Sequence, residues 1–193
     1  MTETVRKLAT WDDLLATLDD GRTYEIIAGL MEALPRPRPG HGNAQALLSG
    51  EIVRPFQRGR GGPGGWWIII EPDVELTTND IIVPDLAGWK RDKVPEFPHD
   101  RPIRFVPDWI CEVLSPTNQK RDRVVKANLY LTCGVMYYWI LDVQERTLEA
   151  YSAKEGSSVR LGAWTDGDTS RIPPFEAIEL EVEGLFPPPP SSS

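Results

Sequence analysis

Two carboxylates stand inside apolar stretches of this 193-residue sequence, and both are candidate ligands for a hard metal ion. Glu112 interrupts the apolar run "WICEVL", and Asp85 follows Pro84 in "IIVPDLAGW". Burying a carboxylate costs several kcal/mol unless the group is paired or binds a metal. Oxygen ligands without a nearby His or Cys suit Mg²⁺ or Mn²⁺ better than zinc. A salt bridge or a solvent-filled gap at Glu112, and an ordinary turn at Asp85, are the alternatives.

Two further residues could complete such a site. Glu25 lies among apolar neighbours in "YEIIAGLMEAL" and could supply a third acid, or it could be an exposed acid of a hairpin. Lys126 follows Glu112 on the next predicted helix, which should run back over the sheet. Its ammonium group could then polarise an attacking water or a phosphoryl oxygen. The alternative for Lys126 is a solvated lysine on the outer face of the helix.

A cluster of cations precedes Lys126. Lys120, Arg121 and Arg123 lie near the start of the predicted helix, where positive side chains oppose the helix dipole. A bound phosphate would relieve this unfavourable arrangement, because exposed N–H groups and cations both attract anions. The alternative is a solvated basic surface, moderated by Asp122.

The elements that must position these residues alternate between strands and helices. β-Branched and aromatic residues predict strands over 66–76, 81–89, 108–115 and 135–142. Cap and stop residues predict a helix over 117–134. The strand–helix–strand unit from 108 to 142 predicts a parallel crossover. Before it we expect a helix over 10–20, a hairpin over 24–34 and a helix over 41–56; after it we expect extended segments at 147–153, 159–164 and 177–186. The order predicts an α/β fold with a mixed central β-sheet flanked by helices.

Composition sets the boundaries of the molecule. The length suits a single domain over 1–186, and the Pro- and Ser-rich segment 187–193 is expected to be a disordered tail. No apolar stretch reaches the roughly 20 residues that span a bilayer, and the N-terminus does not resemble a signal peptide, so we expect a cytoplasmic protein. The net charge is −8, which argues against a generic nucleic-acid binder. Residues 36–141, however, have 14 basic and 12 acidic side chains, so an anionic partner can be accommodated there.

Several of these segments together resemble a known family. They are "YEIIAGLMEAL", the helix that opens at His41, "IIVPDLAGW", "PDWICEVLSPTNQKRD", "KANLY" and "GVMYYWILD". In this order and spacing they are similar to the PD-(D/E)XK nuclease superfamily, and more closely to its Uma-type family of proposed restriction endonucleases. The resemblance covers about residues 8–186. It implies a restriction-endonuclease-like core, here with an N-terminal helix–hairpin–helix extension, and metal-dependent DNA cleavage, often by a homodimer.

The resemblance also assigns roles to individual residues. Asp85 and Glu112 would bind Mg²⁺ or Mn²⁺, with the Val113 carbonyl as a further ligand. Lys126 would be a catalytic lysine relocated from strand to helix, and Glu25 would be the acid usual in the early hairpin. His41 and Gln119 are weaker candidates for contact with substrate, beside Lys120, Arg121 and Arg123.

Two departures from the family pattern define the competing interpretations. The wider superfamily places a lysine two residues after the second acid, where this chain has Leu114, and related chains have an acid at the position of Tyr137. The leading interpretation is a Mg²⁺-dependent endonuclease that acts on DNA. One alternative is a non-catalytic module that keeps the nuclease fold to bind nucleic acid or protein. Another is a metal-dependent phosphohydrolase that acts on a small substrate.

Overall fold

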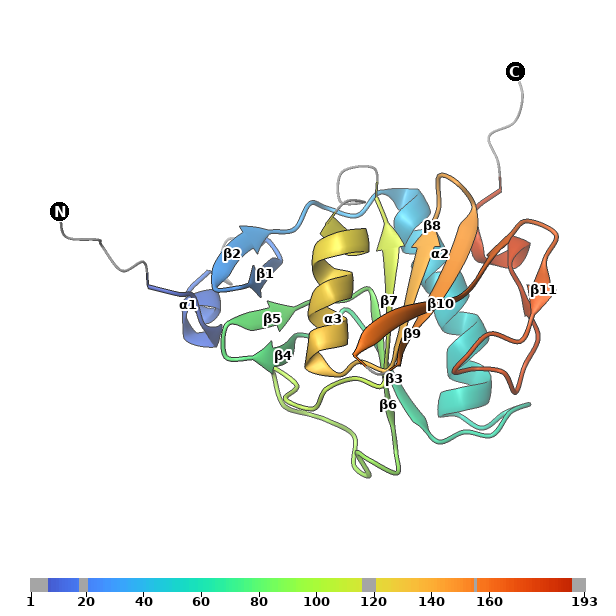
Figure 1. Ribbon diagram of the computed structural model, residues 1–193, viewed down its shortest axis with the longest axis horizontal. Helices are drawn as coiled ribbons and strands as arrows, with labels where there is room; N and C mark the ends of the chain where they lie inside the picture. The colour runs from blue at the N-terminus through green and yellow to red at the C-terminus, as the bar shows by residue number, and fades with distance from the viewer. Residues whose placement is uncertain (1–6, 18–20, 116–120, 155, 189–193) are drawn as a thin grey trace, which may run out of the picture.

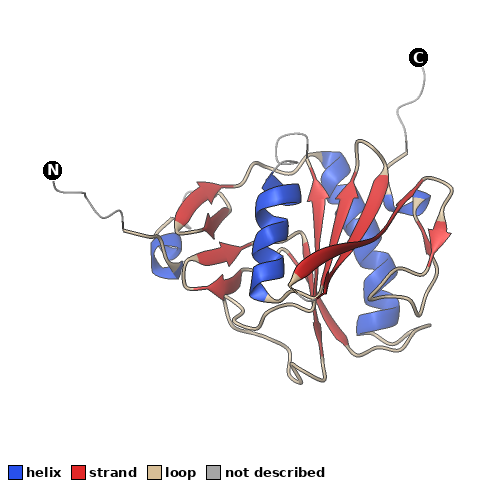
Figure 2. Cartoon of the chain, viewed as in Figure 1, coloured by secondary structure: helices blue, strands red, loops and turns tan. Residues whose placement is uncertain are grey.

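A six-stranded sheet separates two helical layers (Figures 1 and 2). The computed structural model describes residues 7–17, 21–115, 121–154 and 156–188. The helices are α1 (Trp11–Leu15), α2 (Pro39–Ile52) and α3 (Ala127–Cys133), with π-helical turns η2 (Val53–Gln57) and η3 (Arg121–Lys126) and the 3₁₀ turn η4 (Glu183–Leu185). The strands are β1 (Tyr24–Ile27), β2 (Leu30–Ala33), β3 (Trp66–Ile70), β4 (Val74–Thr77), β5 (Asp80–Ile82), β6 (Leu86–Lys90), β7 (Trp109–Leu114), β8 (Tyr137–Asp142), β9 (Thr147–Lys154), β10 (Ser157–Thr165), β11 (Thr169–Ser170) and β12 (Leu180–Glu181).

The strand order confirms the predicted mixed α/β class. The central sheet runs β10-β9-β8-β7-β6-β3, and its only parallel pair in the described chain is β7 with β8. This pair is the crossover that the sequence predicts, with η3 and α3 between its strands. A second sheet, β2-β1-β5-β4, lies beside the first, and β11 pairs with β12. The predicted N-terminal helix–hairpin–helix extension is not confirmed, because the β1–β2 hairpin pairs with β5 and so belongs to the second sheet.

Two predicted strands are wrong in their extent. The segment 66–76 divides into β3 and β4, which belong to different sheets, and 81–89 divides into β5 and β6. The first break falls at Glu71, which has a φ of 48°, directly before Pro72. The second falls at Pro84, which has no N–H to donate to a neighbouring strand. Apolar composition continues through both breaks, so it could not reveal them.

Two other predicted elements are shorter than expected, and a third is described only in part. The helix predicted over 10–20 ends at Leu15, although Thr10 is its N-cap as predicted. The helix predicted over 117–134 is described from Arg121, and it ends as predicted at Gly134, whose φ of 88° is readily adopted by glycine. Its candidate caps, Thr117 and Asn118, lie outside the described residues. The last extended segment contains only β12, followed by η4.

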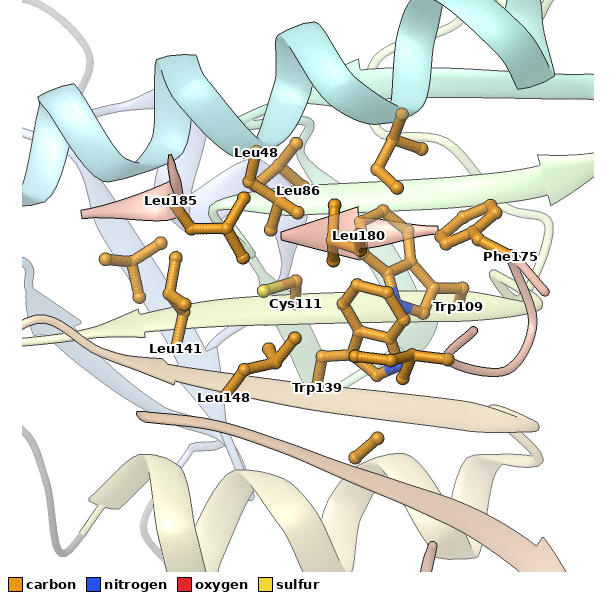
Figure 3. Close-up of a cluster of buried hydrophobic side chains, with 14 of the residues drawn as sticks. Leu48, Leu86, Trp109, Cys111, Trp139, Leu141, Leu148, Phe175, Leu180 and Leu185 are labelled. Atoms are coloured by element: carbon orange, nitrogen blue, oxygen red, sulfur yellow. The ribbon is translucent and has the colours of Figure 1, made fainter. Parts of the chain in front are cut away.

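The larger apolar core lies between the sheet and α2 (Figure 3). Trp109 and Trp139, from adjacent strands, meet edge to face with ring centroids 5.5 Å apart. Phe175, from the chain after β11, packs on both rings at 4.9 and 5.5 Å. Edge-to-face aromatic pairs add about 0.5–1.5 kcal/mol beyond the area that they bury. This layer covers the sheet on the side opposite α3.

The opposite face of the sheet packs against α3. Its core combines Ile110 and Leu114 of β7 with Tyr130 of α3 and Tyr138 of β8, all buried. Side chains alternate between the two faces along a strand. Glu112 therefore lies on this α3 face, between Ile110 and Leu114.

Candidate functional site

Asp85 and Glu112 lie at the point where two strands of the central sheet separate. β6 pairs with β7 from Gly88 opposite Trp109 to Leu86 opposite Cys111, and the pairing stops there. Asp85 is the next residue on β6's side, and its Oδ2 accepts a hydrogen bond of 2.7 Å from the Val113 amide. The Asp85 carboxylate therefore accepts the hydrogen bond that a backbone carbonyl of β6 would accept from β7 if the pairing continued. This opening between strands leaves room for a site at the end of the sheet.

The first two turns of α2 hold Asp85 from the other side. His41 Nε2 lies 3.0 Å from Asp85 Oδ1, and Gln45 Nε2 donates to the Asp85 backbone carbonyl at 2.9 Å. Gln45 also donates to Glu71 Oε1 at 3.2 Å. His41 and Gln45 are four residues apart and thus share one face of the helix. Burial acts to lower the pKa of His41, but the hydrogen bond and charge of Asp85 outweigh it and raise that pKa.

Glu112 is held by two residues from the helical side. Its Oε1 accepts a hydrogen bond of 3.1 Å from Lys126 Nζ and a short hydrogen bond from the Tyr130 hydroxyl. Only 4% of its side chain is exposed. Lys126 and Tyr130 are four residues apart, so they lie one above the other on the face of η3 and α3 that covers the sheet.

Lys126 is the centre of a buried charge cluster. Its Nζ lies 2.7 Å from Glu25 Oε1, 3.1 Å from Glu112 Oε1 and 3.7 Å from Asp122 Oδ1. Glu25 Oε1 also accepts a bond of 2.9 Å from the Val83 amide, in the break between β5 and β6. A lysine surrounded by three carboxylates joins the hairpin, the central sheet and the helix at one point.

Negative charge exceeds positive charge in this cluster, and the pKa values of the acids respond. Burial, together with the repulsion of Asp122, Asp85 and Glu25, raises the pKa of Glu112 well above its ordinary value despite the attraction of Lys126. Burial and the charges of Glu25 and Asp85 raise the pKa of Asp122 to about 6. Burial lowers the pKa of Lys126, but the surrounding carboxylates outweigh this and raise it, so the amine is protonated. The site would be stabilised by further positive charge.

A cavity of about 270 Å³ gives access to these groups. Asp85, Glu112, Asp122 and Lys126 line it, together with Val113. Asp85 and Glu112 therefore face the same space, although one comes from the end of β6 and the other from the middle of β7. Their carboxylates lie at the inner end, since only 14% and 4% of their side chains are exposed.

Of the other candidates, two are paired with acids and two lie outside the described residues. Arg121 pairs with Glu25 at 3.2 Å and Glu32 at 3.0 Å. Arg123 pairs with Asp142 and Glu149 and does not line the cavity. Both guanidinium groups are thus already neutralised by acids. Lys120 and Gln119 fall outside the described residues.

Four residues of the site were missed from the sequence: Asp122, Tyr130, Gln45 and Glu71. Helical spacing was the available signal for three of them, because Asp122 and Tyr130 flank Lys126 at four residues and Gln45 follows His41 at four. Each residue was inconspicuous alone, since a charged or polar side chain on a helix is usually solvated. Glu71 gave no signal, because its place depends on the break between β3 and β4.

The donor set fits a hard divalent cation held by few protein ligands. Within the described part of the chain, no group of three or more His, Cys, Asp or Glu side chains is placed so that it could hold a metal ion. Asp85 and Glu112 nevertheless face one cavity of excess negative charge. Mg²⁺ typically takes one or two carboxylates and completes its shell with waters and substrate oxygens. An open pair of carboxylates of this kind suits that ion better than a dedicated all-protein cage.

The comparisons with known proteins agree with this architecture. A family model described as "Uma2: Putative restriction endonuclease" matches residues 11–183. A crystal structure described as "a putative nuclease belonging to DUF820 from Anabaena variabilis" aligns with a TM-score of 0.68 at 22% identity, over 92% of this chain and 97% of that one. At that identity the likeness shows a shared fold. No curated protein matches the chain. In the described segments, no helix is both long and apolar enough to cross a membrane.

Proposed function

Because the chain belongs to the Uma2 family of putative restriction endonucleases, we propose that it is a Mg²⁺- or Mn²⁺-dependent endonuclease that hydrolyses DNA phosphodiester bonds. The family supports a nuclease-like function in general. The observation that carries the specific proposal is the convergence of Asp85 and Glu112 on one cavity, with Lys126 in hydrogen-bond contact with Glu112. Two strands that separate at this point present both carboxylates to the same space.

Asp85 and Glu112 would hold the metal ion, with the Val113 carbonyl as a further ligand. The ion would supply charge stabilisation for the phosphate and a more acidic bound water. The Val113 amide and His41 fix the two oxygens of Asp85, and Lys126 and Tyr130 fix Oε1 of Glu112. Ligands held by such hydrogen bonds do not have to reorganise when substrate binds.

Lys126 acts in this proposal as a cation and not as a base. Its raised pKa keeps the amine protonated, so it cannot accept the proton of the attacking water. It holds Glu25 and Glu112 in place and lies where it can stabilise negative charge on a phosphoryl oxygen. This role also compensates for Leu114, because the ammonium reaches Glu112 from the helix instead of from β7.

The test is cleavage of supercoiled plasmid in the presence of Mg²⁺ or Mn²⁺. The wild-type protein should nick the plasmid, and Glu112→Gln should reduce the rate at least about 100-fold, because a neutral amide is a poor ligand for the metal. Glu145→Gln is the matched control, because Glu145 is exposed and does not line the cavity. Circular dichroism would verify that both variants fold. Equal rates for Glu112→Gln and wild type would refute the assignment.

One observation favours the alternative of a non-catalytic binding module. Lys126 already contacts Glu25 and Glu112 in the structure, so the chain's own lysine compensates part of the negative charge that a metal ion would otherwise balance. A module of this kind would bind DNA with a steep salt dependence, with or without a divalent ion, and would show no turnover. The same plasmid assay, combined with binding at several salt concentrations, separates the two functions.

The family resemblance also suggests a homodimer. We include this in the proposal as a property of the DNA-bound enzyme, where two copies would present two sites to the two strands. Analytical ultracentrifugation with and without DNA would give the number of chains per complex.

A further inference from the structure

A proline-spaced segment with two arginines forms the rim of the cavity. Residues 35–39, "PRPRP", join β2 to α2 and are exposed. Proline restricts its own φ, and it also keeps the residue before it extended. Both Arg36 and Arg38 precede a proline, and Arg38 is extended, with φ −78° and ψ 157°. The segment is thus a stiff extended arm with a cation at every second residue.

The two arginines of this arm lie beside an acidic site and have no acidic partner among the residues that the structure describes. Both line the cavity that contains Asp85 and Glu112. Neither forms an ion pair with any acid in the described part of the chain. Arg121, by contrast, is neutralised by Glu25 and Glu32. In a chain of net charge −8, exposed cations without acidic partners are the groups available to bind an anionic ligand.

The cavity continues into a hollow at each end of the arm. A hollow of about 680 Å³ on the hairpin side shares Pro35, Arg36 and Pro37 with it. A hollow of about 330 Å³ at the start of α2 shares Arg38 and His41 with it. Because neighbouring hollows share these residues, the three adjoin one another along the arm, and we call this row of hollows the groove; Asp85 and Glu112 line the hollow that shares residues with both others. Such a path suits a polymer, because a small ligand would need only the central cavity.

The depth of the acids restricts the form of that polymer. Both carboxylates lie at the inner end of a cavity of about 270 Å³, with 14% and 4% of their side chains exposed. An intact DNA duplex is stiff over about 150 base pairs, so its backbone does not bend locally into a hollow of this size. A single strand is flexible, and it can lower one phosphate into the cavity while its neighbours stay at the rim.

We propose that the groove binds single-stranded DNA, with phosphates on Arg36 and Arg38 and the scissile phosphate between them, above Asp85 and Glu112. This assignment of substrate form rests on the proposed nuclease function. The first turn of α2, which begins after Arg38, places the positive end of the helix dipole at the same end of the groove. Unpaired or displaced strands would therefore be cut in preference to paired ones.

The test measures binding of a fluorescein-labelled single-stranded oligonucleotide by anisotropy, with the metal removed by EDTA, over a series of salt concentrations. Arg36→Ala/Arg38→Ala should weaken binding at least about tenfold and reduce the slope of log K against log salt by about 1.4, which is about 0.7 for each lost phosphate contact. Arg58→Ala/Arg60→Ala is the matched control. It removes the same charge from exposed arginines at a hollow that shares no residue with the groove, and it should change the slope by less than about 0.3.

The same measurement with a duplex of identical sequence should show at least about tenfold weaker binding. Equal affinity for duplex and single strand, or equal effects of the two double variants, would overturn the inference. Because binding is measured without metal, its outcome is independent of cleavage. If binding depended on Arg36 and Arg38 but no cleavage occurred in Mg²⁺, the proposed nuclease function would be refuted and the groove assignment would still be supported. If the protein cleaved duplex DNA or a small phosphodiester in preference to single-stranded DNA, the proposed hydrolytic function would be supported and the groove assignment would be refuted.

Discussion

The two faces of β7 have opposite physical characters. On the face towards α2, Trp109, Cys111 and Val113 pack into an apolar layer. On the face towards α3, Glu112 lies between two apolar residues and forms part of a charge cluster. The same six-residue strand therefore contributes to a dry core and to a candidate active site. Along β7 the apolar core and the charge cluster thus lie on opposite faces of the sheet, and α2 contacts the candidate site at Asp85, beyond the end of β6.

The two faces also depend on their neighbours in different ways. Apolar packing is non-directional and its contributions accumulate, so the loss of one contact leaves the others in place. Buried charges depend on one another, because removing one partner leaves the rest desolvated and uncompensated. We therefore expect substitutions on the α2 face to respond little to pH, and substitutions on the α3 face to respond strongly.

The largest effect is expected on the apolar face. Trp139→Ala should reduce the free energy of unfolding by about 3–5 kcal/mol, because the indole packs on Trp109 and Phe175 and donates to the Pro173 carbonyl. Urea denaturation followed by circular dichroism measures the change. The loss should be the same at pH 5 and pH 8, and a strongly pH-dependent loss would contradict the separation of the faces.

Removing the central cation should have the next largest effect. Lys126→Met should cost about 3 kcal/mol at pH 8, because Glu112 is then left buried without a cation and Glu25 keeps only Arg121. Arg104→Ala is the control, since it breaks an exposed ion pair with Glu75 and should cost less than about 1 kcal/mol.

A second substitution sharpens this result. Glu112→Gln introduced into Lys126→Met should recover at least about 1 kcal/mol, because it removes one uncompensated charge. No comparable recovery is expected between two substitutions on the apolar face. Additive losses in the double variant would show that Lys126 stabilises the fold through packing of its side chain and not through its charge.

The smallest effect comes from the titration of Asp122. Its pKa is raised to about 6 from an ordinary value of 3.8, so the folded state binds the proton more tightly than the unfolded state. Its stabilising contribution is therefore complete below about pH 4 and is lost as the pH rises through about 6. Asp122→Asn removes this loss, so it should be equal to wild type near pH 4 and more stable by about 1–3 kcal/mol above pH 6. Thermal unfolding at several pH values measures the difference. If the stability of Asp122→Asn relative to wild type fell as the pH rises, the sign would be reversed and the assignment contradicted.

Much of the fold was accessible from local patterns in the sequence. The apolar strand around Glu112, the helix that ends at Gly134 and the parallel partner at 137–142 follow from residue types and spacing. These features are local, because side-chain periodicity and glycine stops act over a few residues. The divisions at Glu71 and Pro84 were missed, since apolar composition is continuous through them and only pairing with different sheets separates the parts.

The candidate site shows the same limit at the level of single residues. Asp85, Glu112, Glu25 and Lys126 were conspicuous because each is charged in or near apolar sequence. Tyr130 and Gln45 were not, since a polar residue on a helix gives no sign of what it will contact. The arginines at 121 and 123 were conspicuous and yet are paired with acids that lie far away in the chain.

Residue types and their spacing thus establish which chemical groups this protein has and in which strands and helices they lie. They do not establish which of those groups meet. Asp85 and Glu112 share a cavity because β6 and β7 stop pairing at Leu86, and Lys126 reaches Glu112 and Glu25 because α3 packs across the sheet beside the hairpin. Lys126 is 14 residues from Glu112 in the sequence and 101 residues from Glu25. These contacts arise from the packing of whole elements, whose energies no short stretch of sequence contains.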